Sequence, residues 1–221
     1  MPTPLNLADA ETAVDAQTFA SRAARVGDGA VRLRASSGIL VMTCAPIAPR
    51  GILDTSPTIL GVRVLAADPE LECDLVVDGA SLRAHGVTLE LPDAGLRAAW
   101  AGISPPASGW TVTGEIASTD LVAAAHRGME EVATSVPSNA GEDVVRQIRA
   151  AVWGAPDAAL GGIPRGVGFV SKVLGFLGQD AESVPLRESG PWRRLSLRRG
   201  HVLVRGSAAN SRESGAAQAA R

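Results

Sequence analysis

Several kinds of residue are scarce in this chain, and each scarcity excludes a class of protein. Tyrosine is absent, phenylalanine occurs three times, and one lysine, Lys172, stands beside twenty arginines. The two cysteines and three histidines show no CxxC or HxxxH spacing, so the sequence predicts no metal site and no cofactor. No apolar run approaches the roughly 18 residues that span a bilayer. The start of the chain has no basic region followed by an apolar one, so we expect a soluble cytoplasmic protein with no membrane contact.

The signature motifs of common enzymes are missing as well. The stretch GGIPRGVGFVSK is rich in glycine, but valine follows Gly166 where a phosphate-binding loop needs lysine. The sequence contains no GxSxG, HExxH or calcium-binding loop. The paired acids at 130–131 and 142–143 fall on expected helix surfaces, where a solvated role is the rule. Nothing therefore recommends an enzyme, although none is excluded, and no catalytic residue is predicted.

The composition is that of a folded globular protein. Of 221 residues, 46% are hydrophobic and 20% are charged, which argues against bulk disorder. We expect a flexible N-terminus over residues 1–11, a single α+β domain over residues 12–206 and a disordered tail over residues 207–221.

Periodicity predicts the elements of that domain. Alternating or continuous apolar runs predict strands over residues 30–34, 39–44, 58–65, 71–77, 81–84, 87–91 and 110–116. Apolar stripes at helical spacing predict helices over residues 15–26, 121–136, 142–153 and 167–177. The fold class is therefore α+β: an antiparallel sheet with helices packed on it, closed by a C-terminal β-hairpin.

That hairpin, residues 187–205, is the most unusual stretch of the sequence. It holds six arginines and one glutamate, whereas residues 1–186 hold 13 basic and 21 acidic residues. With Arg199 and Gly200 as the turn, alternation sends four aliphatic side chains inward: Leu195, Leu197, Val202 and Val204. The opposite face carries the candidate ligand-binding residues Arg194, Arg198, His201 and Arg205, beside Ser196 and Leu203.

Like charges on neighbouring strands favour an anionic partner for this face, and three kinds of partner stay open. The leading one is an acid of the same body or of a partner subunit, in a non-enzymatic binding or assembly protein. A homodimer through the apolar helix over residues 167–177 or through the hairpin is one form of this hypothesis. The alternative is an enzyme or ligand-binding protein that holds a small phosphate or carboxylate there, with help from Arg50 and Asp54 of the proline-rich loop at 45–57. The net charge of −2 and the lack of interleaved aromatic residues beyond Trp192 argue against the third partner, nucleic acid.

Three stretches also carry a resemblance to known sequences. These are GPWRRLSLRRGHVLVR at 190–205, AAVWGAP at 150–156 and LGFLG at 174–178. The chain resembles, over most of residues 12–206, uncharacterised proteins of high-GC actinobacteria. That family has no assigned activity, so the resemblance implies no catalytic residue.

Overall fold

The computed structural model describes residues 4–51, 54 and 56–205. These fall into two compact units, and each unit draws on two separate segments of the chain. The first comprises Met1–Pro46 and Leu60–Ser104, and the second comprises Ile47–Ile59 and Pro105–Arg221. The single folding domain expected over residues 12–206 stays a prediction, because this division does not test whether either unit folds alone.

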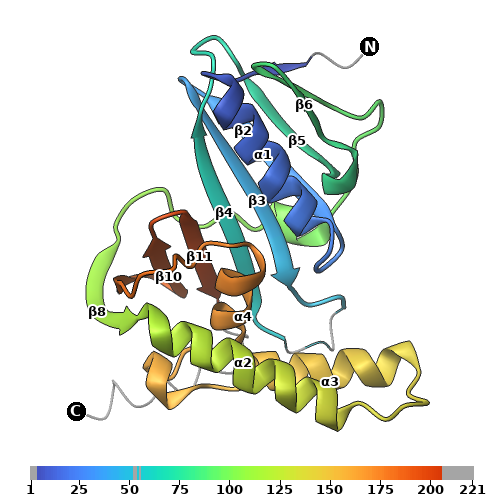
Figure 1. Ribbon diagram of the computed structural model, residues 1–221, viewed down its shortest axis with the longest axis vertical. Helices are drawn as coiled ribbons and strands as arrows, with labels where there is room; N and C mark the ends of the chain where they lie inside the picture. The colour runs from blue at the N-terminus through green and yellow to red at the C-terminus, as the bar shows by residue number, and fades with distance from the viewer. Residues whose placement is uncertain (1–3, 52–53, 55, 206–221) are drawn as a thin grey trace. The chain divides into compact units, whose positions relative to one another are not determined.

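The first unit is one helix with two sets of antiparallel strands (Figure 1). Helix α1 (Ala10–Ala23) begins earlier than predicted because the Asp9 carboxylate accepts a hydrogen bond from the Thr12 amide at 2.7 Å. One set has the order β5-β2-β3-β4 and the other β1-β7-β6. The bounds are β1 (Leu5–Asn6), β2 (Ala30–Ser36), β3 (Ile39–Ile47), β4 (Thr58–Ala66), β5 (Cys73–Asp78), β6 (Arg83–His85) and β7 (Thr88–Glu90), with 3₁₀ turns at Gly79–Ser81 and Ala99–Gly102.

The second unit has four antiparallel strands and most of the helical residues. Its strands lie in the order β11-β10-β9-β8, and Figure 1 shows α2 and α3 running alongside each other. The bounds are β8 (Thr111–Ala117), α2 (Ser118–Ser135), α3 (Glu142–Gly154), a 3₁₀ turn (Ala158–Leu160), α4 (Gly166–Val173), β9 (Ser183–Ser189), β10 (Trp192–Leu197) and β11 (Gly200–Arg205). Strand β9 is absent from the elements predicted from the sequence.

Close packing at two glycines brings elements of the second unit together. A Cβ atom on Gly168 of α4 would lie 2.5 Å from the Leu121 carbonyl oxygen of α2, so the two helix backbones approach closely. The ring of Phe176, which follows α4, occupies the space above Gly200 of β11, 2.5 Å from where a Cβ would be. Helix α4 and Phe176 therefore pack against β11.

The predicted fold class is confirmed. Each unit combines helices with antiparallel strands, and the C-terminal hairpin is formed by β10 and β11. Among the described residues, none of the helices combines the length and the apolar character needed to cross a membrane.

Candidate functional site

The C-terminal hairpin forms with a register two residues away from the predicted one. Its turn residues are Arg198 and Arg199, and Leu195 pairs with Val202. Gly200, read from the sequence as a turn residue, is instead the first residue of β11, where the Phe176 ring leaves no room for a side chain. Because the shift is an even number of residues, every side chain within the strands keeps its predicted face.

The predicted site residues of the hairpin are therefore only partly brought together. Arg194, His201 and Arg205 share the face that points away from Leu195 and Val202. Arg198 does not join them, because it lies exposed in the turn. The same face also carries Trp192 and Leu203, which are buried, so it is not the continuous basic surface expected from the sequence.

Strand β9 brings another arginine to this face. Gly190 and Pro191 form the turn between β9 and β10, and Arg187 of β9 lies directly opposite Arg194. The next pair in register is Glu188 with Arg193, which form an ion pair with a 2.7 Å contact between the carboxylate and Nε. Since neighbouring residues of a strand point to opposite faces, this acid neutralises Arg193 and leaves the face of Arg194 without its charge.

Arg194 lies over an aromatic ring instead of a carboxylate. Its guanidinium carbon is 4.7 Å from the centre of the Trp110 ring, a cation–π contact. The Trp110 indole N–H donates to the Pro106 carbonyl at 3.1 Å, which fixes the ring. Burial, together with the charge of Arg187, lowers the pKa of Arg194 below its ordinary value.

Buried polar atoms of β10 lie on this face without a hydrogen-bond partner in the described part of the chain. Examples are Nε of Arg194 and Oγ of Ser196, which lies two residues further along the strand. A buried polar group left without a partner costs about 1–3 kcal/mol of folding free energy. We call the four residues Trp110, Arg187, Arg194 and Ser196 the arginine face. Its distinguishing property is a set of hydrogen-bond donors and positive charge with no acceptor supplied by neighbouring side chains.

Arg50 and Asp54 meet within their own loop. The Asp54 carboxylate accepts hydrogen bonds from the backbone amides of Arg50 at 3.0 Å and Ser56 at 2.9 Å. Burial raises the pKa of Asp54, but these hydrogen bonds and the charge of Arg146 outweigh it, so the pKa lies below its ordinary value. The carboxylate thus organises the loop, and neither of these contacts reaches the hairpin.

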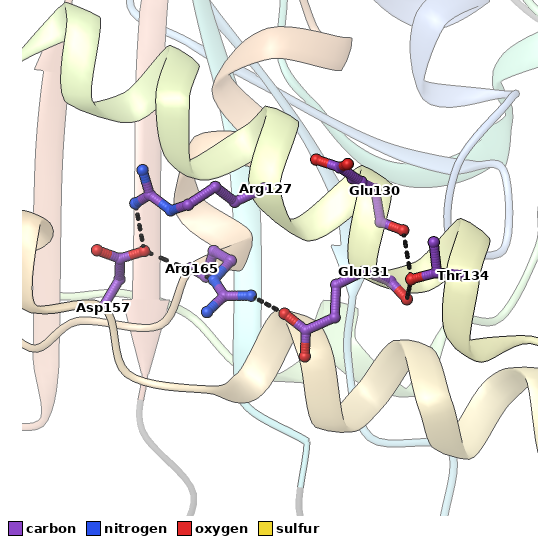
Figure 2. Close-up of polar contacts among 6 residues, drawn as sticks. All are labelled: Arg127, Glu130, Glu131, Thr134, Asp157 and Arg165. Carbon is purple, nitrogen blue, oxygen red and sulfur yellow. Dashed lines mark hydrogen bonds and ion pairs between the residues drawn. The ribbon is translucent and has the colours of Figure 1, made fainter.

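A second charged cluster joins α2 to the loop before α4 (Figure 2). The Asp157 carboxylate, 7% exposed, lies 2.8 Å from Nη2 of Arg127 and 3.5 Å from Nε of Arg165. Arg165 also pairs with Glu131. Burial raises the pKa of Asp157, but the hydrogen bond and charge of Arg127, with smaller contributions from the Ala159 amide and Arg165, hold it below its ordinary value.

This cluster differs from the arginine face because both of its arginines already have carboxylate partners. The backbone of α2 is also hydrogen-bonded here, since the Thr134 hydroxyl donates to the carbonyls of Glu130 and Glu131 at 3.0 and 3.2 Å. We therefore interpret the cluster as a structural support of the second unit. Among the described residues, no three His, Cys, Asp or Glu side chains are placed to hold a metal ion.

Sequence reasoning missed two members of the arginine face, Trp110 and Arg187. Trp110 precedes β8 and is far from the hairpin in sequence, so no local pattern connects it with Arg194. The position of Arg187 on a strand could have been predicted from the sequence. Gly190 and Pro191 are strong turn residues, and reading them as a hairpin turn predicts a strand before them that carries Arg187.

Two family models match the chain, one before and one after residue 103. Residues 1–102 match a model described as Domain of unknown function (DUF8010), and residues 105–209 match one described as Domain of unknown function (DUF8185). The break between the matches agrees with the end of the first unit at Ser104. No curated protein matches the chain. The resemblance to actinobacterial sequences stays a prediction.

The fold is similar to that of bacterial DNA polymerase sliding clamps. The DnaN sliding clamp (DNA polymerase III subunit beta) of Bartonella birtlesii, solved bound to griselimycin, is 11% identical with a TM-score of 0.50, over 93% of this chain and 65% of that one. The pol III beta of Caulobacter crescentus is 11% identical with a TM-score of 0.49, over the same shares of the two chains. The beta subunit of Thermotoga maritima is 14% identical with a TM-score of 0.48, again over 93% and 65%. The chain thus spans 65% of the length of these clamps, and the likeness is one of fold.

This likeness contradicts two expectations drawn from the sequence. The first is the leading function, a binding protein whose hairpin pairs with acids of its own body or a partner subunit, together with its alternative, a protein for a small anionic ligand. The second is the low rank given to nucleic acid as a partner. The low rank of nucleic acid relied on the net charge of −2, whereas contacts with phosphate depend on local charge. On the arginine face that local charge is positive, and among the described residues neither Arg187 nor Arg194 forms an ion pair with an acid.

Proposed function

We propose that the protein is a DNA-associated, replication-related assembly protein built on the sliding-clamp fold, and that it acts in the cytoplasm. The observation that supports this most is the fold likeness over 93% of the chain to a clamp named as a subunit of DNA polymerase III. The arginine face adds independent support, because Arg187 and Arg194 present positive charge that no carboxylate among the described residues neutralises. Non-specific binding to DNA depends chiefly on such charges.

The proposal includes the assembly of more than one copy of the chain on the same DNA. The copies then add their phosphate contacts, and binding by several linked sites exceeds the affinity of each one. We therefore expect DNA binding that depends on assembly as well as on charge.

A retention experiment tests this proposal. The full chain is incubated with closed circular plasmid or with the same plasmid cut once, and both are washed in rising salt before bound protein is measured. A protein that surrounds or tracks the duplex stays longer on the circle, because cutting creates ends from which it can leave. The solution mass of the protein, measured alone and with the cut plasmid, gives the number of protein copies that assemble.

Two results count against the proposal. One is a full chain that binds neither plasmid at about 50 mM salt, where electrostatic binding is strong. The other is equal loss from circular and cut plasmid throughout the salt series, since that describes ordinary contact with the DNA surface and no clamp-like association.

A further inference from the structure

Helices α2 and α4 pack closely together (Figure 1), and they bring the single lysine of the chain beside a histidine. Nζ of Lys172, in the last turn of α4, lies 2.8 Å from Nε2 of His126 on α2. A hydrogen bond between these nitrogens needs one that donates and one that accepts. The two side chains therefore do not carry a full positive charge each while the contact exists.

No carboxylate in the described part of the chain forms an ion pair with Lys172. Arg127 and Arg165 differ from it, because each of them reaches a carboxylate. Glu130 lies one turn from His126 along α2, and among the described residues it forms an ion pair with neither member of the pair. A carboxylate beside a lysine favours the ammonium form, whereas a neutral imidazole can accept a proton from the amine.

Both side chains of the pair are accessible to a small reagent. His126 is exposed and Lys172 is half-buried, and the hydrogen bond between them lies at the surface. Lysine is also a side chain that acyl groups modify in proteins, whereas arginine stays charged and keeps its protons. The chain has twenty arginines and one lysine, so a reagent that needs a side-chain amine has one target.

We infer that Lys172 is an acylation site that takes its acyl group from an acyl phosphate, with His126 as the proton acceptor. The ammonium first releases one proton to water. The neutral amine then forms an N–C bond with the carbonyl carbon, while the C–O bond to phosphate breaks and phosphate leaves with its electron pair. The second proton of the amine passes to Nε2 of His126, which transfers it to the departing phosphate or to water. Transfer of this kind to a positioned imidazole is general base catalysis.

Acylation alters the end of α4, and this effect does not depend on the proposed function. Lys172 places a positive charge in the last turn of α4, where the free carbonyl groups of a helix favour a cation. The acylated side chain has no charge, so its interactions with these carbonyls and with His126 weaken. The chain then continues to Phe176, whose ring packs on Gly200 of β11. The modification therefore acts on the junction of α2, α4 and the hairpin.

The rate of acetylation by acetyl phosphate tests this inference. The full chain reacts in the same tube as an unstructured peptide with one lysine, and mass mapping of peptides gives the acetylated fraction of each. General base catalysis contributes about 100-fold or more at enclosed sites, and for this surface pair we expect Lys172 to react roughly tenfold faster than the lysine of the peptide. Lys172→Arg should remove the modification.

His126→Gln is the variant that removes the proton acceptor. It should lower the rate at Lys172 to within about twofold of the peptide rate, because the positioned base is gone. His85→Gln is the matched control. His85 is exposed like His126, but it belongs to the first unit and contacts Glu90, so its loss should leave the rate at Lys172 unchanged.

The pH dependence separates a proton acceptor from a residue that only positions the amine. Imidazole groups take up and release protons between about pH 5 and 8. The ratio of the Lys172 rate to the peptide rate should therefore rise through this range in the wild-type chain and stay constant in His126→Gln. Circular dichroism checks the fold of each variant. If His126→Gln does not fold, the pH dependence of the wild-type ratio decides the question by itself.

Four results overturn the inference. They are a wild-type rate equal to that of the peptide, a wild-type ratio that stays constant with pH, a folded His126→Gln variant with the wild-type rate, and a loss in His85→Gln as large as that in His126→Gln. Each of them would show that the contact between Lys172 and His126 joins α2 to α4 without making the amine more reactive.

Discussion

At the scale of single residues, Asp157 has the most closely defined role. Its carboxylate is 7% exposed and receives Arg127 from α2 and Arg165 from the start of α4. The same side chain accepts a hydrogen bond from the Ala159 amide at 3.1 Å, at the beginning of a 3₁₀ turn. One buried charge therefore joins a long helix, a turn and a short helix. The free energy of unfolding of the second unit should depend on that charge.

We predict that Asp157→Asn lowers the free energy of unfolding by about 2 kcal/mol at pH 7, the size typical of a hydrogen bond to a charged group. The folded-state pKa of Asp157 lies below its ordinary value. Its contribution is therefore complete above the unfolded pKa of about 3.9 and is lost as the pH falls through the lower folded value. Urea unfolding of both proteins between pH 2.5 and 7 should show the difference shrinking below about pH 4.

Asp143→Asn is the control for this measurement. Asp143 pairs with Arg146 on the same helix, but its side chain is 79% exposed, and exposed pairs of this kind contribute about 0.3–0.5 kcal/mol. A difference between wild type and Asp157→Asn that stays constant from pH 7 down to pH 3 would show that the charge of Asp157 is not what stabilises the unit.

At the scale of elements, periodicity in the sequence located most helices and strands but not their contacts. Helix α3 (Glu142–Gly154) and β8 (Thr111–Ala117) lie within one residue of their predicted bounds, because each has a regular apolar pattern. Strand β9 was missed since its sequence, SVPLRES, contains a proline and little alternation. The hairpin register was wrong because Gly200 has its role in packing under Phe176, a contact between distant residues that no local pattern reveals.

The candidate site shows the same limit. Alternation correctly placed Arg194, His201 and Arg205 on one face, because the face of a side chain survives an even shift in register. The unfavourable pairing of Arg194 with Arg187 and its stacking on Trp110 depend on which strands become neighbours. That choice is made by tertiary packing. The residues of the site were thus partly predictable, and their partners were not.

The approach of α2 and α4 gives a prediction at this scale. In an open helix, Gly→Ala stabilises by up to about 1 kcal/mol. At Gly168 the added Cβ would lie 2.5 Å from the Leu121 carbonyl oxygen and 3.2 Å from the Ala125 amide nitrogen, both backbone atoms that cannot rotate away. We therefore expect Gly168→Ala to lower the free energy of unfolding by about 1–3 kcal/mol, measured by urea denaturation.

Gly114→Ala provides the comparison, because nothing lies within 4 Å of a Cβ at Gly114 of β8. Its effect should stay within about 0.5 kcal/mol, as for surface substitutions in general. An alanine at position 168 that raises the free energy of unfolding would mean that α2 and α4 are further apart than the structure places them.

At the scale of the whole molecule, the two units are interleaved in sequence. The second unit includes Ile47–Ile59, which lies between two segments of the first. Ile59 is fully buried and Ile47 is 9% exposed. The Cδ1 atoms of Ile47 and Ile59 lie 2.6 and 2.7 Å from the position that a Cβ on Gly166 would take. A family match that begins at residue 105 therefore leaves out part of the core of the unit that it covers.

This connectivity predicts how the chain unfolds. A fragment of residues 105–221 lacks both isoleucines, and their burial contributes about 3–6 kcal/mol together, a large part of the 5–15 kcal/mol that stabilises a typical domain. We expect the fragment to be unfolded or marginally stable alone, and the full chain to unfold in one transition, as the single domain predicted over residues 12–206 requires. Tryptophan fluorescence in urea measures both, since Trp110, Trp153 and Trp192 belong to the second unit.

A peptide of residues 47–59 should stabilise the fragment, and the same peptide with Ile47→Ser and Ile59→Ser should not. A fragment as stable as the full chain would show instead that the second unit folds without its inserted segment.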